Sequence, residues 1–185
     1  ACGGTLTAAS GGPVTSPNFP RNYGINEICE WLITVPTGNT IRLTFDSFDV
    51  EENYDFLNIY DGANVSVTRL RSFTGSQSVS PITSTSNVVF LRFTSDPILT
   101  SQGFQFSYTS QIVVSADLTL AGEVFTDDLH DMNHPRYQIL ARTIEFETSL
   151  AFAEVPSFRQ ATVTGFRMGS VIATVDMEFE NTGQT

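Results

Sequence analysis

Alternating apolar and polar positions dominate residues 40–109. Ile41, Leu43 and Phe45 alternate with polar residues, and the same period of two returns in the segments VVFLRF and GFQFSY. Because successive side chains of a strand point to opposite faces, this pattern predicts half-buried strands. Turn-forming pairs such as Asp61-Gly62 separate them. The first 110 or so residues therefore predict an all-β antiparallel sandwich.

The periodicity changes after residue 111. The expected elements are a strand over residues 113–120, a short helix from Thr126, a second helix from Pro135 and a hairpin within residues 161–179. Phe125, Leu129 and Met132 form the expected apolar face of the short helix. This order of elements predicts a small α+β domain with an antiparallel sheet, and we place the domain boundary near residues 110–112.

The charge of the chain narrows the possible partners. The formal net charge is -11, and all nine cationic residues are Arg. Residues 1–110 hold five Arg and nine acidic residues (5 − 9 = −4), and the remainder holds four and eleven (4 − 11 = −7). An acidic chain of this kind is a poor nucleic-acid binder and is better suited to cations or basic partners. No stretch approaches the roughly 18 apolar residues of a membrane span, so none is expected.

Two cysteines and one sequon indicate where the chain resides. Cys2 and Cys29 are an even pair, which predicts one disulfide and an oxidising compartment. Asn64-Val65-Ser66 is a glycosylation sequon, with Asn64 as the acceptor. We therefore expect an extracellular protein, either secreted or the ectodomain of a membrane-anchored protein.

An ordered set of motifs gives residues 1–111 a specific resemblance. The set is Cys2-Gly3-Gly4, Ser16-Pro17-Asn18-Phe19-Pro20, Asn22-Tyr23, Cys29-Glu30-Trp31, residues 45–51, Tyr54-Asp55-Phe56-Leu57, Tyr60-Asp61-Gly62, Phe93-Thr94-Ser95-Asp96 and Gly103-Phe104. In this order the motifs resemble those of a CUB domain. The resemblance implies a jelly-roll β-sandwich that serves in protein interactions.

The CUB resemblance also implies a calcium site. The motif positions assign its carboxylates to Glu51, Asp55 and Asp96, and three carboxylates suit a hard cation that takes roughly 6 to 8 oxygen ligands. The same carboxylates, with Tyr23 nearby, would form an edge that receives Lys or Arg of a partner protein. The sequence departs from the family pattern at two places near these calcium ligands. Asn53 stands where the family usually has a cysteine in a longer loop, which leaves Glu52 as an alternative to Glu51, and the loop over residues 96–102 is longer than the compact family version.

Residues 112–185 have a resemblance of their own. The motifs are Phe125-Thr126-Asp127-Asp128-Leu129, Tyr137, Leu140, Ile144-Glu145, Phe158 and Gly169-Ser170-Val171-Ile172-Ala173. They resemble an SEA domain, which implies a ferredoxin-like α+β fold. In many members the Gly-Ser bond cleaves itself, which implies self-cleavage at Gly169-Ser170, although an ordinary hairpin turn fits equally well. A complete member continues through a further helix and strand, so we expect an open sheet edge that the rest of a longer protein or another chain covers.

Enzymatic sites have little support in the sequence. His130 and His134 have the spacing of some zinc sites, but no cysteine or third histidine accompanies them, and solvated histidines at helix ends fit better. The sequence contains neither the Gly-x-Ser-x-Gly motif of a hydrolase nucleophile elbow nor a phosphate-binding glycine-rich loop between a strand and a helix. Two functions remain open: calcium-dependent recognition of a basic partner, or a structural role in matrix, filament or mucus-like material.

Overall fold

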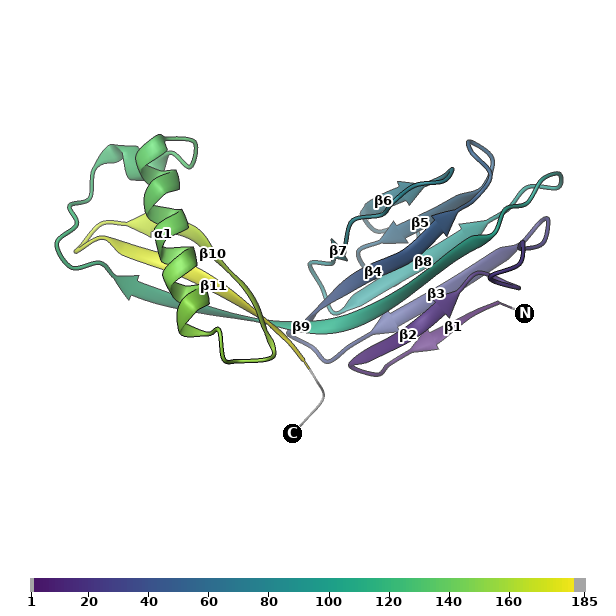
Figure 1. Ribbon diagram of the computed structural model, residues 1–185, viewed down its shortest axis with the longest axis horizontal. Coiled ribbons are helices and arrows are strands. Elements are labelled where there is room, and N and C mark those ends of the chain that lie inside the picture. Colours follow the sequence, from purple (N-terminus) through teal and green to yellow (C-terminus); the bar gives the residue numbers. More distant parts are fainter. Residues whose placement is uncertain (1, 182–185) are drawn as a thin grey trace. The chain divides into compact units, whose positions relative to one another are not determined.

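The computed structural model describes residues 2–181, and the description below concerns these residues (Figure 1). The chain divides into two compact units. The first unit comprises residues 2–111 together with residue 181, and the second comprises Ile112–Glu180. Strand β9, Gly103–Thr119, contributes its first part to the first unit and its last part to the second.

Two sheets build the first unit. One has the strand order β1-β3-β8-β5-β6, and in the other β9 pairs with β4 and β2, and β4 pairs with β7. The strands are β1 (Gly3–Leu6), β2 (Ser10–Thr15), β3 (Ile28–Thr34), β4 (Thr40–Asp49), β5 (Phe56–Tyr60), β6 (Arg69–Phe73), β7 (Ile82–Thr83) and β8 (Val88–Thr94). All pairings are antiparallel except β1 with β3, which is parallel. The predicted sandwich is confirmed, with β1 as the exception to its antiparallel pattern.

The core of the first unit follows the alternation of the sequence. Ile41, Leu43 and Phe45 of β4 are buried, as are the apolar residues that alternate along β8 and β9. Phe104 lies at the centre, stacked on Phe48 at 5.8 Å between ring centroids. Aromatic pairs in such geometries contribute about 0.5 to 1.5 kcal/mol beyond their buried area. The core therefore holds the two sheets together and fixes the ends of their strands.

The second unit combines one helix with a short antiparallel sheet. Its elements after β9 are a 3₁₀ helix η1 (Asp127–His130), α1 (Pro135–Ala151), β10 (Phe158–Arg167) and β11 (Ile172–Glu180). The sheet order is β10-β11-β9, and α1 packs against β10 through Tyr137, Ala141 and Ile144. Val171, Ala173 and Val175 are buried, as the period of two in this hairpin predicts. The predicted α+β arrangement is present. Its resemblance to an SEA domain, with a ferredoxin-like fold, stays a prediction.

The short predicted helix differs from expectation in three respects. It is a 3₁₀ helix of four residues, and Met132 is 60% exposed, so the prediction that Met132 lies on its apolar face is wrong. Thr126 stands at the N-cap position, but its hydroxyl bonds Asp128 and Arg136 instead of a backbone amide. The tight turns of a 3₁₀ helix align positions three apart, and the segment ends before Met132 reaches the core.

Candidate functional site

Three carboxylates from separate segments meet at one end of the first unit. Glu51 follows β4, Asp55 precedes β5, and Asp96 follows β8. Each contributes a carboxylate oxygen to a group whose members lie within 4.8 Å of one another. The structure thus brings together the three predicted calcium ligands.

Sheet pairing explains why residues far apart in the sequence meet here. Phe56 of β5 pairs with Thr94 of β8, so the residues before one strand and after the other lie side by side. The amide of Asp96 donates a 2.8 Å hydrogen bond to Oδ1 of Asp55 across a separation of 41 residues. Asp55 is fully buried, and this bond fixes one of its two oxygens. The register of β5 against β8 therefore determines the spacing of the two aspartates.

Tyr23 lies beneath the carboxylates. Its hydroxyl donates a short hydrogen bond to Oδ2 of Asp55 and accepts one of 2.9 Å from the amide of Glu51. The side chain is 2% exposed, so it offers little surface to a partner. Burial, together with the bond to Asp55, raises the pKa of Tyr23 to about 12. Tyr23 is thus suited to holding Asp55 and the Glu51 backbone in place.

Thr74 stabilises the short loop between Glu51 and Asp55 through hydrogen bonds to its backbone. Its hydroxyl accepts a 2.8 Å bond from the amide of Asn53 and donates a 3.1 Å bond to the carbonyl of Glu51. The amide of Asp55 also donates to the Glu51 carbonyl, at 3.2 Å. Polar contacts therefore order this loop, although Asn53 occupies the place where the family usually has a cysteine.

The electrostatics of the cluster favour a cation. Burial and the nearby charges of Asp96 and Asp55 raise the pKa of Glu51, because all three disfavour its ionised form. Oxygen Oε2 of Glu51 is buried and has no hydrogen-bond partner. Asp55 keeps lone pairs free beyond its two hydrogen bonds, since an ionised carboxylate accepts about four. The donor set consists of oxygens alone, which is the chemistry that Ca²⁺ prefers, and the residues present therefore fit this ion.

Glu52, the alternative to Glu51, lies outside the cluster. It is exposed, and Glu51 supplies the third carboxylate of the group.

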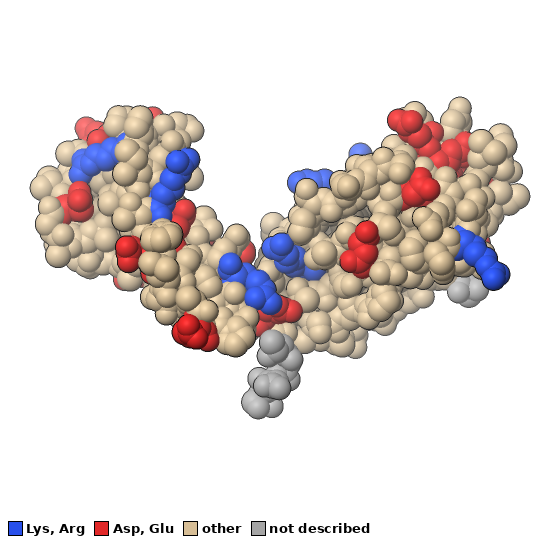
Figure 2. Space-filling model, in the orientation of Figure 1, with Lys and Arg blue, Asp and Glu red and all other residues tan. Residues whose placement is uncertain are grey.

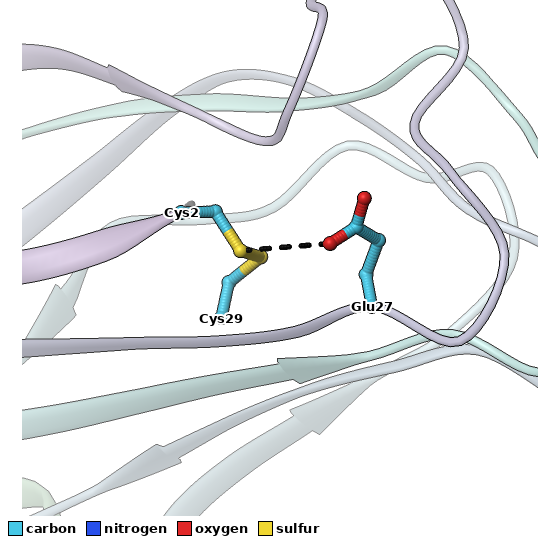
Figure 3. A group of neighbouring side chains, drawn as sticks. All are labelled: Cys2, Glu27 and Cys29. Atoms are coloured by element: carbon cyan, nitrogen blue, oxygen red, sulfur yellow. Dashed lines mark hydrogen bonds between the residues drawn. A yellow bond between two sulfur atoms is a disulfide. The ribbon is translucent and has the colours of Figure 1, made fainter.

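A second group in the described chain comprises Cys2, Glu27 and Cys29, with a Glu27 oxygen 3.8 Å from the Cys2 sulfur (Figure 3). Cys2 and Cys29 form the predicted disulfide, with 5.1 Å between their Cα atoms. Disulfide sulfurs carry neither a proton to donate nor a thiolate to bind metal, so this group is a structural contact.

The histidines have structural roles. Nδ1 of His134 accepts a 3.2 Å bond from the amide of Arg136, which caps α1, and His130 packs edge-on against Phe125. Neither belongs to a potential metal group among residues 2–181.

Two further predicted positions lie in exposed turns. Gly169 and Ser170 fall in the turn between β10 and β11, where Gly169 has a φ of 131°. This backbone conformation is costly for residues with a Cβ atom, so the turn requires glycine.

Asn64 is exposed in the segment between β5 and β6, and its side chain accepts a 2.9 Å bond from the amide of Ser66. Both positions are accessible to the chemistry predicted for them.

The charged side chains form no large basic surface on the face drawn in Figure 2, where blue and red residues are interspersed. Within the described residues, no helix has the length and hydropathy needed to cross a membrane.

Comparison with known proteins identifies relatives of this chain. Residues 2–108 match the family model described as the CUB domain. The chain is 36% identical over 138 residues to cubilin of Canis lupus familiaris, covering 74% of this chain and 4% of cubilin. It is 34% identical over 115 residues to tolloid-like protein 2 of Mus musculus, covering 60% of this chain and 11% of that protein. The chain thus spans only a small part of these relatives.

Solved structures agree with the sequence relatives. The crystal structure of the MASP-1 CUB2 domain bound to Ca²⁺ superimposes with a TM-score of 0.53 at 28% identity, covering 59% of this chain and 99% of that one. The CUB1-EGF-CUB2 region of human MASP-1/3 gives a TM-score of 0.53 at 30% identity, covering 59% of this chain and 42% of that one. Because the family match ends at residue 108, the SEA resemblance of the second unit stays a prediction.

Proposed function

Since the chain belongs to the CUB domain family, we propose that it is a non-enzymatic, extracellular interaction protein whose first unit binds Ca²⁺ and recognises Lys or Arg of a partner protein. CUB domains mediate protein–protein interactions, and the cubilin and tolloid-like relatives are extracellular or ectodomain proteins. The disulfide and the exposed sequon asparagine, Asn64, support an oxidising, glycosylating compartment.

The convergence of Glu51, Asp55 and Asp96 is the observation that carries this proposal. Three ionised carboxylates with oxygens within 4.8 Å of one another repel, and a bound cation would relieve this repulsion. Bound Ca²⁺ would neutralise two of the three charges and leave the edge with a net charge of about −1, which attracts a basic side chain. Tyr23 and Thr74 support the proposal, because they fix Asp55 and the Glu51 backbone before any ligand arrives.

Calorimetric titration of the calcium-free protein tests calcium binding. We expect a single site, an increase of the melting temperature in millimolar calcium, and loss of both in Asp55→Asn. Glu52→Gln is the matched control, because it removes a neighbouring charge outside the cluster. A wild-type protein that shows no heat and no thermal shift at millimolar calcium would contradict the proposal.

A second candidate function is assembly through the second unit, supported by an uncovered apolar face. Residues 112, 114, 116 and 118 of β9 are Ile, Val, Ala and Leu on one face of the strand, and Leu118 is 39% exposed. Ala116 and Leu118 line a groove of about 420 Å³ together with Ala151, Phe152, Val175 and Met177. Helix α1 packs on the β10 side of this sheet, which leaves the β9 side open.

We propose that a second copy of this chain covers this face. Over residues 112–119, β9 has β11 as its sheet neighbour, and its other edge has no strand beside it in the described chain. Antiparallel pairing of two such edges around a two-fold axis keeps both α1 helices on one side, so the two grooves adjoin. Self-association of this kind fits the structural role in matrix or filament material.

Sedimentation over a range of concentrations tests this assembly. The second unit carries a net charge of −7 (4 − 11), so added salt should strengthen a dimer by screening repulsion. Leu118→Glu should abolish the dimer, whereas Phe146→Glu, at a 62% exposed position on α1, should preserve it. A monomer at every concentration and salt level would rule out self-association.

Self-cleavage at Gly169–Ser170 is the remaining proposal for the second unit. The Ser170 hydroxyl would attack the Gly169 carbonyl carbon, and the peptide nitrogen would leave as the amine of an ester-linked chain. Water would then hydrolyse the ester to a Gly169 carboxylate and a free Ser170 hydroxyl. The exposed turn and its glycine geometry support access to this bond. Mass spectrometry of the denatured protein decides the matter: cleavage gives two fragments, and a single chain of 20.3 kDa excludes it.

A further inference from the structure

Large exposed apolar side chains occur in the segments that carry or adjoin the carboxylate cluster of the first unit. Ile98 and Leu99 follow Asp96 and are 72% and 60% exposed. Tyr54, next to Asp55, is 62% exposed, and Ile25 is 51% exposed. Single exposed apolar residues are common, but here three segments that carry or adjoin one charged site each contain them.

Hydrogen bonds hold the segment that carries Ile98 and Leu99. The Ile98 amide donates a 2.9 Å bond to Oδ1 of Asp96. On the other side, the side chain of Asn22 donates a 2.9 Å bond to the Thr100 carbonyl, and the Tyr23 amide bonds the Ser101 carbonyl at 3.2 Å. The two apolar side chains are therefore displayed by a segment anchored at both ends.

Backbone hydrogen bonds also connect the segments of Ile25 and Tyr54 to the cluster. The Asn26 amide donates a 2.8 Å bond to the Asp96 carbonyl, which holds the neighbouring Ile25 beside the cluster. Tyr54 lies within the short loop that the bond from Asp55 to Glu51 closes. Two residues span at most about 7 Å, so the Cα atom of Ile98 lies within about 7 Å of that of Asp96.

We propose that this surface recognises an extended segment of a partner protein in which a Lys or Arg is separated by one residue from a large aliphatic residue. The proposal rests on the calcium-dependent site described above. The cation meets the carboxylates of Glu51, Asp55 and Asp96, and the aliphatic side chain packs on Ile98 and Leu99. In an extended segment, side chains two positions apart share a face and are about 6.6 to 7 Å apart, so a basic and an aliphatic side chain at this spacing can reach Asp96 and the nearby Ile98 and Leu99 together.

The chemistry favours a mixed basic and aliphatic segment over an isolated basic residue. A calcium-occupied cluster attracts any cation, and such attraction weakens as salt screens it. Burial of aliphatic surface adds a salt-insensitive contribution, and the methylene stem of Lys also covers apolar surface. The exposed aliphatic residues therefore provide selectivity among basic segments.

NMR titration of the full chain in millimolar calcium tests this inference. The probes are synthetic peptides with a Gly-Ser background that contain Lys-Ser-Leu, Leu-Ser-Lys or Lys-Ser-Ser. We expect at least one Leu-containing peptide to bind about tenfold more tightly than the Lys-Ser-Ser peptide, with amide shifts at Ile98 and Leu99. Ile98→Ser and Leu99→Ser should remove this preference without changing calcium affinity. Val65→Ser is the matched control, because Val65 is 44% exposed beyond the other end of β5.

The outcomes separate the inference from the function on which it rests. Equal affinity for all three peptides on the wild-type protein would overturn the inference and leave the proposed function intact. A preference for Leu that persists when both Ile98 and Leu99 are Ser would overturn it as well. If no Lys-containing peptide binds in calcium, the proposed recognition of basic residues is itself wrong, and the inference fails with it.

Discussion

The hydroxyl of Tyr23 donates a hydrogen bond to the carboxylate of Asp55, and both side chains are at most 2% exposed. A buried carboxylate needs such a partner, because an unpaired charge in the interior is costly. The same hydroxyl also receives the Glu51 amide. One buried phenol thus links two of the three proposed calcium ligands, and its removal tests the organisation of the site.

Tyr23→Phe should weaken both the fold and calcium binding. The substitution leaves Asp55 without its donor and the Glu51 amide without its acceptor. We expect a loss of about 1.5 to 3 kcal/mol in the free energy of unfolding, as for hydrogen bonds to charged groups. Urea denaturation measures this loss, and calorimetry measures the accompanying fall in calcium affinity. Tyr54→Phe, at a 62% exposed position, should change neither quantity.

Alkaline pH should destabilise the wild-type protein through Tyr23. Its pKa is raised to about 12 by burial and by the bond to Asp55, against about 10 in the unfolded chain. The neutral phenol therefore stabilises the fold fully below pH 10, and this stabilisation is lost as the pH rises from about 10 to 12. Melting temperatures measured across this range should decline less steeply in Tyr23→Phe. An identical decline in both proteins would contradict the assignment.

Glu51→Gln should stabilise the calcium-free protein while it abolishes or weakens calcium binding. Burial and the charges of Asp96 and Asp55 raise the pKa of Glu51 in the folded state. For such a group, stability is greatest below the unfolded pKa near 4.5 and is lost as the pH rises through the folded value. At pH 7 in chelator, the variant should therefore melt above the wild-type protein, and the difference should shrink in acid. Calcium should reverse the order of the two melting temperatures.

Loss of the Cys2–Cys29 disulfide should lower stability substantially. The bond closes a segment with a sequence separation of 27, which corresponds to about 3 to 4 kcal/mol on the chain-entropy model. A Cys2→Ala, Cys29→Ala double variant should show this loss in denaturant unfolding. Because the bond joins Cys2, which precedes β1, to Cys29 of β3, and neither cysteine belongs to the carboxylate cluster, calcium affinity under folding conditions should change little. A loss below about 1 kcal/mol would indicate that strand pairing alone holds the N-terminus.

Local patterns in the sequence were sufficient for much of the fold. The alternation at Ile41, Leu43 and Phe45 predicts a strand with a buried face, and these residues are buried in β4. Pro135 marks the first residue of α1, as expected from its fixed φ and missing amide proton. These features depend on backbone geometry over a few residues, so periodicity and single residue types reveal them.

The three carboxylates of the site were assigned by motif, but their convergence is a tertiary property. Asp55 and Asp96 meet because Phe56 pairs with Thr94, and a register change of one residue would turn the side chains to the other face. The choice of Glu51 over Glu52 likewise depends on how Tyr23 and Thr74 hold the loop. No local pattern encodes these contacts, because their partners lie 23 to 41 residues away.

The sequence by itself determined the strands, the helix, the cysteine pair and the acidic residue types, since each of these follows from local geometry or composition. Only the tertiary structure decided which side chains outside the regular strands are buried and which are exposed. Tyr23, expected at a binding edge, lies in the interior, whereas Ile98 and Leu99 are held exposed beside the carboxylates. Burial depends on packing between distant segments, and packing is settled by the register and stacking of the two sheets.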